Sequence, residues 1–483
     1  MLHFKLILNV LGILLIAIGA LMIVPLLFDL VYQNSSWLAF LISSMISISF
    51  GIALFLSTRG GDKQRLIMQD AFLLTSSSWI LIALFGCIPF FLSDSNMNFT
   101  DSFFESMSGV TTTGSSVIQN INNMSEGILI WRALLQWLGG VGIIVMALSI
   151  LPVLQVGGMQ VFRAESSDTT EKILPRTAQI STAVIIIYLI LTFSCFALYW
   201  IFGMSAFDSF AHSMTTIATG GFSTKNSSIA FFNNVYIEYT SAIFMILSSL
   251  PILIYLKFSK QQFKSILKDT QVRTFLIIIL MGVISVILYL WLNDIKNLND
   301  SIRYGFVNVT SIITGTGYTT DNYNLWGPFP IYLLFFGMFI GGCAGSTTCG
   351  IKVFRFQILF ETFKNQIQKL LHPHGVFVPH YNHKKLENDV TTSVMSFFFV
   401  FILVFVAITL LLSMTNLDFV TSLSAAATSL ANVGPGLGST IGPESTFYSL
   451  SIPAKWILIV SMLLGRLELF TILVLFLPAF WRK

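Results

Sequence analysis

Long apolar runs recur along the chain, separated by short polar connections. A helix needs about 20 residues to cross the hydrocarbon core of a bilayer, and each run has roughly that length. The pattern therefore predicts ten spanning helices, at Leu6–Phe28, Trp37–Ser57, Ala71–Leu92, Ile128–Leu151, Ile180–Gly203, Val235–Leu256, Phe275–Leu292, Pro330–Gly350, Thr391–Met414 and Pro453–Pro478. No small-residue cleavage pattern follows the first run, so we expect it to be a retained helix and not a removable signal peptide.

Four connections on one side contain a second, shorter kind of segment. From Asp101, Asp208, Ser301 and Asp418 onward, roughly 10–12 residues pass from apolar to small side chains, too few to span but suited to a re-entrant half-helix. The unit of span, half-helix, loop and span thus occurs four times. The predicted division is a two-helix segment at residues 1–66, then repeats at 67–176, 177–272, 273–389 (with a cytoplasmic loop) and 390–483.

Composition supports a membrane protein. The 483 residues are 55% hydrophobic and only 10% charged, whereas a soluble domain carries about 25% charged residues. Lipid, unlike water, is a suitable solvent for that much apolar surface. The four cysteines show no spacing typical of a disulfide framework or a zinc site; they are Cys87, Cys195, Cys343 and Cys349.

Lysine and arginine gather in the connections that follow every second run, and hence on one side of the membrane. The groups are Arg59, Lys63 and Arg65; Arg163, Lys172 and Arg176; Lys257, Lys260, Lys264, Lys268 and Arg273; and Lys352, Arg355, Lys364, Lys369, Lys384 and Lys385. The other side keeps Arg132, Lys225, Lys296, Arg303 and Lys455. The positive-inside rule makes the basic side cytoplasmic, and an even number of crossings places both termini there.

Each half-helix ends in a short stretch rich in hydroxyl groups and glycine. Aligning Gly114, Gly220, Gly317 and Gly434 gives a repeat of about 100 residues. The candidate ion-binding segments are Thr111-Thr112-Thr113-Gly114, Ile217-Ala218-Thr219-Gly220, Thr314-Gly315-Thr316-Gly317 and Ala431-Asn432-Val433-Gly434. They are either ordinary turns outside the membrane or one shared structure, and four copies at matched positions favour the second.

A cation that crosses a bilayer must exchange its water shell for oxygen atoms held at fixed distances. A ring of backbone carbonyls provides them without adding formal charge, and glycine lets the backbone turn those carbonyls toward an axis. A half-helix C-terminus carries about −0.5 of a charge, so four of them aimed at one point favour a cation. No Arg or Lys lies inside the four loops, which argues against an anion pore.

At these residues the chain resembles the Trk/Ktr/HKT superfamily of cation transporters, and specifically its bacterial TrkH type, over nearly its whole length. The extra N-terminal helix pair also resembles the TrkH type. Three further stretches carry the likeness: Gly157–Glu165 with Pro175-Arg176 after it, Gly341–Thr347 and Asn432–Pro435. Gly114 stands where sodium-preferring plant relatives carry serine, so the resemblance favours potassium. Gly315, where a threonine is common, departs from the pattern and leaves the fine selectivity open.

The resemblance implies an all-α membrane protein, with two N-terminal helices followed by four helix–pore-loop–helix repeats around a central pore. It implies potassium uptake across a bacterial inner membrane and not an enzymatic activity. No cofactor is expected, because the potassium ion is the substrate. The implied partners are a second copy of the chain, forming a homodimer, a cytosolic TrkA-type nucleotide-binding subunit and the lipid bilayer, with no nucleic acid.

Small and polar residues interrupt the eighth run, at Gly341, Gly342, Cys343, Ala344, Gly345, Ser346 and Thr347. Such residues either unwind a helix within the membrane or permit a close helix crossing, and the sequence pattern alone favours neither interpretation. The resemblance implies an intramembrane loop just below the filter, which acts as a gate.

Arg466 lies near the middle of the last run, where a lone charge costs at least ~3 kcal/mol. Glu468, two residues on, points to a different helix face and is a poor partner. We expect Arg466 to face the pore within reach of carbonyls of the Gly341–Gly350 loop. The alternative is a carboxylate partner on another helix. The resemblance implies that this arginine is an electrostatic barrier below the filter.

Four histidines crowd one cytoplasmic loop without an interleaved cysteine or carboxylate; they are His372, His374, His380 and His383. We expect a hairpin or a docking surface there in preference to a metal site. Other functions also have to be weighed: a sodium- and potassium-permeable or ion-coupled symporter of the same family, and a secondary transporter for an organic solute. The latter usually has inverted repeats, whereas these repeats run in parallel. A membrane enzyme would need convergent catalytic groups that the spans lack.

Overall fold

The structure is a computed structural model, and it describes residues 2–59, 67–95, 97–149, 177–258, 269–382, 384–386 and 388–482. Several residues used above lie outside the described residues. They are Lys63, Arg65, Arg163, Lys172, Arg176, Lys260, Lys264, Lys268 and His383, together with Gly157–Glu165 and Pro175.

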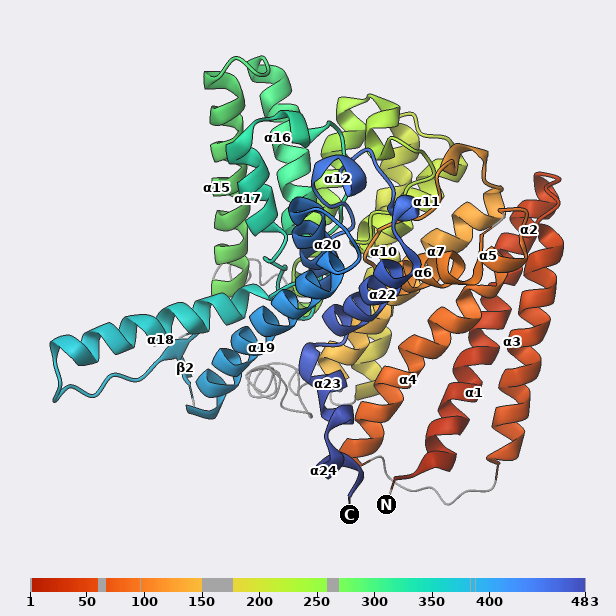
Figure 1. Cartoon of the computed structure of the whole chain (residues 1–483), viewed down its shortest axis with the longest axis horizontal. Coiled ribbons are helices and arrows are strands. Elements are labelled where there is room, and N and C mark those ends of the chain that lie inside the picture. The colour runs from red at the N-terminus through yellow and green to blue at the C-terminus, as the bar shows by residue number, and fades with distance from the viewer. Residues whose placement is uncertain are drawn as a thin grey trace.

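The N-terminal segment is a pair of apolar helices at one flank of the molecule (Figure 1). The elements are α1 (Phe4–Leu21), α2 (Ile23–Val31), which continues α1 beyond Met22, and α3 (Trp37–Ser57). The helices α1 and α3 cross closely, since a Cβ on Gly12 would lie 2.9 Å from the carbonyl oxygen of Gly51. Small residues at such a crossing let two apolar helices pack within a membrane.

Four units of similar design follow. The first contains α4 (Met68–Gly86), α5 (Ile88–Leu92), α6 (Phe99–Val110), η1 (Ile121–Asn123) and α7 (Glu126–Ser149); the second α10 (Thr177–Ile201), α11 (Ala206–Ile217), η3 (Ser228–Phe232), α12 (Val235–Ser248) and α13 (Leu253–Phe258). The third contains α15 (Thr270–Leu292), α16 (Leu298–Ile313), η4 (Tyr323–Leu325), α17 (Pro328–Gly337), α18 (Val353–Leu371) and the strands β1 (His380–Tyr381) and β2 (Lys384–Lys385). The fourth contains α19 (Asn388–Ser413), α20 (Phe419–Ala431), α21 (Gly438–Ile441), η5 (Phe447–Ser449), α22 (Ile452–Arg466), α23 (Leu469–Leu473), η6 (Val474–Phe476) and α24 (Pro478–Trp481).

The half-helices α6, α11, α16 and α20 begin in the same way. In each, the side-chain oxygen of the N-cap residue accepts a hydrogen bond from the backbone N–H three residues on, which satisfies one of the free donors at a helix start. The N-cap residues are Asn98, Ser205, Asn297 and Asp418. Three of the half-helices therefore start two or three residues before the points that hydropathy predicts, and α20 starts one residue after Asp418.

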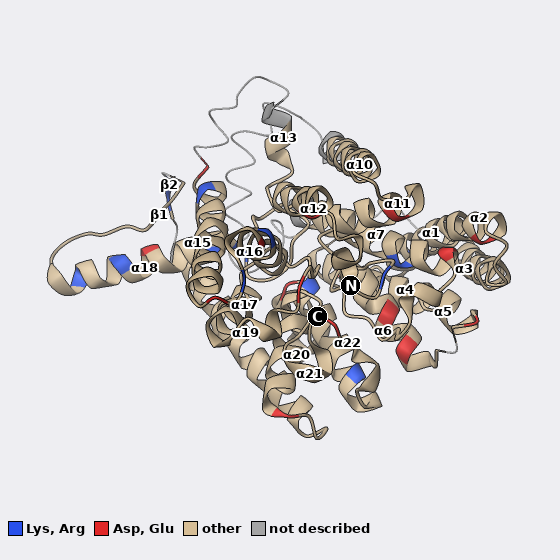
Figure 2. Ribbon diagram, turned by 90° about the horizontal axis from the view of Figure 1, so that it is seen from above, with Lys and Arg blue, Asp and Glu red and all other residues tan. Residues whose placement is uncertain are grey.

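The distribution of polar and apolar side chains is the reverse of that in a soluble protein. Seen from above, the half-helices cluster around the middle, and α3, α10, α15 and α19 lie outside them (Figure 2). The half-helices are almost wholly buried although they are rich in Ser and Thr, whereas the outer helices expose large apolar side chains such as Phe193, Leu280 and Phe399. An exposed apolar belt around a polar centre fits a chain whose solvent is lipid.

Three of the ten predicted spans are not single unbroken helices. The described residues contain seven helices long and apolar enough to cross a membrane, or eight if the bent pair α22 and α23–η6 counts as one span. Val235–Leu256 breaks after Ser248 at Pro251, which cannot continue a helix. Pro330–Gly350 is helical only to Gly337, and Pro453–Pro478 bends by 112° after Arg466. Hydropathy measures apolar length and does not report these breaks.

Both chain ends lie at the same end of the molecule, and α18 extends sideways from the body (Figure 1). The helix α18 carries Lys364 and Lys369 and leads into a two-stranded hairpin in which His380 pairs with Lys385, and Tyr381 with Lys384. Within the described residues no three His, Cys, Asp or Glu side chains come together as a metal site would need. The pairing of β1 with β2 shows that this part of the loop is a hairpin.

Candidate ion pathway

The four glycine-rich loops meet in a closed ring, in which one glycine of each loop abuts a carbonyl oxygen of the next. The pairs are Gly114 with Gly220, Gly221 with Thr316, Gly317 with Val433, and Gly434 with Thr113. In the first three pairs a Cβ on the glycine would clash with that oxygen, and in the fourth it would lie 2.9 Å away. The fourth loop thus returns to the first, and four stretches that are far apart in the sequence surround one axis.

Backbone dihedrals show that the loops are structural copies, and they correct the alignment of the second. Positive φ angles recur two residues apart in every loop, at Thr112 (52°) and Gly114 (86°), Thr219 (49°) and Gly221 (76°), Gly315 (67°) and Gly317 (81°), and Asn432 (52°) and Gly434 (111°). Gly221 therefore occupies the position of Gly114, and the alignment on Gly220 is wrong by one residue. Ile217 belongs to the last turn of α11, so Ala218 opens the second loop.

Three of these positive φ angles belong to residues with side chains. For Thr112 and Thr219 this conformation is sparsely populated and costs of order 1–3 kcal/mol each, whereas asparagine, as at Asn432, adopts it more readily. Such strain persists only where the surroundings enforce it. The positive φ recurs at the same position of three loops, which indicates that the surrounding structure enforces this backbone conformation.

The ring is rich in oxygen atoms. The hydroxyl groups of Thr111 and Thr113 lie 2.7 Å apart, and those of Thr314 and Thr316 lie 2.8 Å apart, all fully buried. The half-helices α6, α11, α16 and α20 end at the ring and direct the negative ends of their dipoles toward it. Backbone and hydroxyl oxygens without a basic side chain in the loops are suited to a desolvated cation.

The segment between α17 and α18 is an irregular loop and not a close helix crossing. Its backbone bonds to neighbouring elements: Cys343 N–H donates to the Ser249 carbonyl at 3.0 Å, Ala344 N–H to Gln271 Oε1 at 2.7 Å, and Gly345 accepts from Ile252 N–H at 2.9 Å. Irregular backbone inside a membrane protein requires such internal partners.

The same loop lies directly against the ring. The hydroxyl groups of Thr219 and Thr347 are 3.3 Å apart, and Cys349 Sγ is 3.7 Å from Thr112 Oγ1 and 3.9 Å from the Thr111 carbonyl oxygen. The intramembrane loop therefore contacts two of the four ring segments.

Arg466 is the last residue of α22, and its guanidinium reaches the intramembrane loop. Its Nη1 donates to the Thr347 carbonyl at 3.2 Å and lies 2.5 Å from Cys349 Sγ, while Nη2 donates to the Gly139 carbonyl at 2.7 Å. Glu468 pairs instead with Arg355, at 2.6 Å. A cavity of about 20 Å³, room for roughly one water, lies between Arg466 and the loop.

The five cations on the side opposite the basic clusters all form ion pairs. The pairs are Arg132–Glu105 (2.7 Å), Lys225–Asp208 (3.5 Å), Lys296–Asp321 (2.9 Å), Arg303–Glu238 (2.6 Å) and Lys455–Asp101 (2.6 Å). Each positive charge is thus matched by a carboxylate, and these cations leave no net positive barrier at that entrance.

The ion pair of Arg132 and Glu105 is buried and joins the first two loops. Arg132 also donates to the Ser223 carbonyl at 2.8 Å, and Glu105 accepts from the Val117 N–H at 2.9 Å. We expect Arg132→Met to lower the free energy of unfolding by about 3–5 kcal/mol, because it leaves a buried carboxylate unpaired. Thermal unfolding of the purified protein measures this.

Lys225→Met provides the matched control. The Lys225 side chain is 25% exposed and its pair is long, so its loss should cost about 0–1 kcal/mol. Equal shifts of Tm in the two variants would contradict the burial argument.

The sequence profile of one family, described as "TrkH: Cation transport protein", matches residues 37–483 of this chain. The chain belongs to the TrkH family. The Trk system potassium uptake protein TrkI of Halomonas elongata is 39% identical over 99% of this chain and 97% of that protein. The Trk system potassium uptake protein TrkH of Escherichia coli K12 is 37% identical over the full length of both chains. The crystal structure of the potassium transporter TrkH from Vibrio parahaemolyticus matches with a TM-score of 0.92, at 35% identity over all of both chains.

Membership of the TrkH family confirms the resemblance drawn from the sequence, and the structural match confirms the predicted fold class. The family is one of cation transport proteins, so the chain is a transporter and not an enzyme. The many apolar helices make it a multi-pass membrane protein.

Two residues of this TrkH-family site escaped the sequence analysis. Gln136 contacts the second loop, and Arg132 was taken only as a marker of topology. They are four residues apart, which places them on one face of α7, and both are polar residues in an apolar run. That spacing of buried polar groups could have pointed to them.

Proposed function

We propose that this chain takes up potassium across the bacterial inner membrane, with the four-loop ring as its selectivity filter. The observation that carries the proposal is the closed ring, in which the four loops abut in cyclic order. Buried carbonyl and hydroxyl oxygens there can replace the hydration shell of a monovalent cation. The Halomonas and Escherichia relatives are named potassium uptake proteins, which supports potassium as the ion.

The filter comprises residues 111–114, 218–221, 314–317 and 431–434, with the second segment shifted by one residue from its sequence-based limits. The proposed gate is the intramembrane loop Gly341–Thr347 together with Arg466. Two contacts support this role: the loop lies against the ring, and the guanidinium lies against the loop. A fixed positive charge in the path would repel a cation.

The proposed topology places both termini in the cytoplasm, with the half-helices entering from the outer side. The division at 1–66, 67–176, 177–272, 273–389 and 390–483 corresponds to the helix pair and four pore repeats. The basic groups and the common location of the two chain ends support this orientation (Figure 1).

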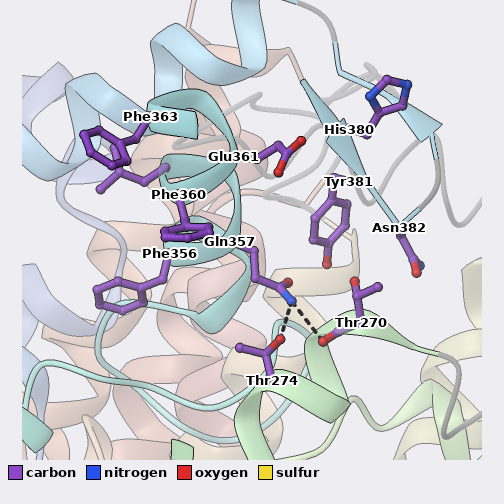
Figure 3. A pocket seen from close by; sticks show the side chains of 11 residues that line it. Thr270, Thr274, Phe356, Gln357, Phe360, Glu361, Phe363, His380, Tyr381 and Asn382 are labelled. Carbon is purple, nitrogen blue, oxygen red and sulfur yellow. Dashed lines mark hydrogen bonds between the residues drawn. The ribbon is translucent and has the colours of Figure 1, made fainter. Parts of the chain in front are cut away.

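The proposed partners are a second copy of the chain and a cytosolic TrkA-type nucleotide-binding subunit. The support is a surface on α18 that is apolar although it projects from the body: Phe360, Phe363 and Leu370 are exposed. Beside them, α18, the hairpin and the start of α15 form an open groove of about 810 Å³, where Gln357 bonds to Thr270 and Thr274 (Figure 3). Exposed apolar surface of this kind is typical of protein contacts.

Uptake of rubidium-86 by the purified protein in liposomes tests the function. We expect uptake into potassium-loaded vesicles, competed by external potassium more strongly than by sodium. Collapse of proton and sodium gradients should leave a channel-like flux intact and should abolish an ion-coupled one. Protein that restores no rubidium uptake either in liposomes or in potassium-uptake-deficient cells would contradict the proposal, as would uptake of an organic solute instead.

A further inference from the structure

Gln136 is an uncharged polar residue in the spanning helix α7, and its side chain is fully buried. A buried carboxamide is costly unless its N–H groups and its oxygen find partners. Those partners lie in the second filter loop. Gln136 Nε2 donates to the Gly220 carbonyl oxygen at 2.6 Å, and the Phe222 N–H donates to Gln136 Oε1 at 3.0 Å.

These two hydrogen bonds bridge Gly221, the ring glycine of the second loop. A carboxamide offers a donor and an acceptor side by side without carrying a charge. The Gly220 oxygen that accepts from Gln136 is also the oxygen against which Gly114 of the first loop packs. Gln136 therefore fixes the junction between the first and second loops from outside the ring.

The same side chain accounts for an irregularity in the sequence of the loops. The third residue of each loop is Thr113, Gly220, Thr316 or Val433, so only the second loop lacks a side chain there. A Cβ on Gly220 would lie 2.5 Å from Gln136 Oε1 and 2.8 Å from Nε2. Gly220 is not among the described residues with positive φ, so its backbone would accept a side chain. The amide of Gln136 occupies that space.

The hydrogen bond to a third-position carbonyl is particular to the second loop. Within the described residues, no side-chain hydrogen bond goes to the corresponding carbonyl of Thr113, Thr316 or Val433. The other three carbonyls abut Gly434, Gly221 and Gly317. Of the four third-position carbonyls, that of Gly220 is thus the one that accepts from a described side chain of a different repeat.

We infer that Gln136 is a positioning residue for ion selectivity, which holds the Gly220 carbonyl at its place in the ring. The inference rests on the proposed function of the four loops as a filter. Discrimination between two monovalent ions depends on the number, field strength and spacing of the coordinating oxygens. Without the amide, the segment from Gly220 to Phe222 loses two hydrogen bonds and can relax, so the ring loses its fixed spacing.

The first test is Gln136→Leu in the full-length protein, purified and placed in liposomes. Rubidium-86 uptake is competed with potassium and with sodium, and the ratio of the two inhibition constants is measured. We expect uptake to persist and the preference for potassium to fall about tenfold, which corresponds to about 1.4 kcal/mol. A Gln136→Leu protein with the full preference of the unmodified chain would overturn the inference.

Trp137→Phe is the matched control on the same helix. It removes one hydrogen bond, from Trp137 Nε1 to Thr192 Oγ1 at 3.1 Å, and leaves both hydrogen bonds of Gln136 in place. Its preference should equal that of the unmodified protein. An equal loss of preference in Trp137→Phe would show that any lost bond in α7 has this effect, and would also overturn the inference.

If Gln136→Leu does not assemble, a second test uses the steric contact between Gln136 and Gly220. Gly220→Ala should lower the amount of protein in the membrane or its preference, because the new Cβ meets the amide. Adding Gln136→Ala should restore part of what Gly220→Ala loses, a non-additive coupling. A Gly220→Ala protein indistinguishable from the unmodified one, or a double variant worse than both single variants, would contradict the inference.

The unmodified protein separates this inference from the proposed function. If it shows no rubidium uptake or no preference for potassium, the filter proposal fails. If it prefers potassium and the Gln136 variants do so equally, only the role of Gln136 fails.

Discussion

Gly317→Ala is expected to reduce rubidium uptake at least tenfold while the protein still reaches the membrane. Gly317 has φ of 81°, which disfavours any side chain, and a Cβ there would clash with the Val433 carbonyl oxygen and lie 2.7 Å from Pro435 Cδ. The left-handed conformation alone costs an alanine roughly 1–2 kcal/mol. The clash adds to this cost, because neither a backbone oxygen nor a proline ring can rotate away.

The larger effect concerns transport and not folding. To admit the methyl group, the third and fourth loops must separate, and the oxygen of Val433 must leave its place in the ring. Each 1.4 kcal/mol added to the barrier for ion passage lowers the rate about tenfold. Uptake is measured with the same liposome assay, at equal amounts of reconstituted protein.

Gly142→Ala is the control for the same chemical change. Gly142 lies in α7, and a Cβ there would be 3.8 Å from the Trp79 ring, an ordinary contact. It should leave uptake unchanged. Normal uptake by Gly317→Ala at normal protein level would show that the ring is not the conduction path.

Hydropathy was sufficient to predict a multi-span helical membrane protein, because membrane insertion depends on apolar length, and apolar length is visible in a sequence. The half-helices could be recognised for the same reason: they are too short to span. What hydropathy could not show is where a long run stops being helical. The break after Ser248 follows from Pro251, which an apolar count ignores, whereas the extent of the loop after Gly337 and the bend after Arg466 depend on partners that the folded chain provides.

The four candidate segments meet in the ring, and only the second is shifted by one residue from its predicted limits. In the first, third and fourth loops, the ring glycine has no glycine neighbour immediately beside it, so alignment identifies it. In the second loop, Gly220 and Gly221 are adjacent, and either could be aligned with Gly114. The choice depends on φ and on the space that Gln136 occupies, and neither is a property of the loop sequence itself.

The environment of Arg466 could not be predicted from the sequence, because it depends on where α22 ends. Counted along an unbroken span, this arginine lies at mid-membrane, where an isolated charge is expensive. In the folded chain α22 ends at Arg466, so the cation lies at a helix C-terminus, where the dipole favours positive charge. Carbonyl oxygens of Thr347 and Gly139 accept from its guanidinium. The surroundings thus stabilise the positive charge that the proposed gate requires.

If Arg466 is part of the gate as proposed, Arg466→Ala is expected to raise rubidium uptake roughly tenfold, because it removes the positive charge that would repel the ion. At about 4 Å, two unit charges repel by roughly 4 kcal/mol at an effective dielectric constant of 20, so even partial relief is measurable. Arg466→Gln keeps much of the side-chain volume without the charge and should raise uptake as well, whereas Arg466→Lys should not. Potassium-uptake-deficient cells provide a second readout, normalised to membrane protein.

The comparison of glutamine with lysine separates charge from packing. If Arg466 only braces the intramembrane loop through Thr347, then alanine, glutamine and lysine should all disturb the loop to some degree, and uptake should follow side-chain size. If the positive charge is the barrier, uptake should follow charge, with lysine near the unmodified protein and the two neutral variants together above it. Unchanged or lower uptake in both neutral variants, at normal protein level, would remove Arg466 from the gate.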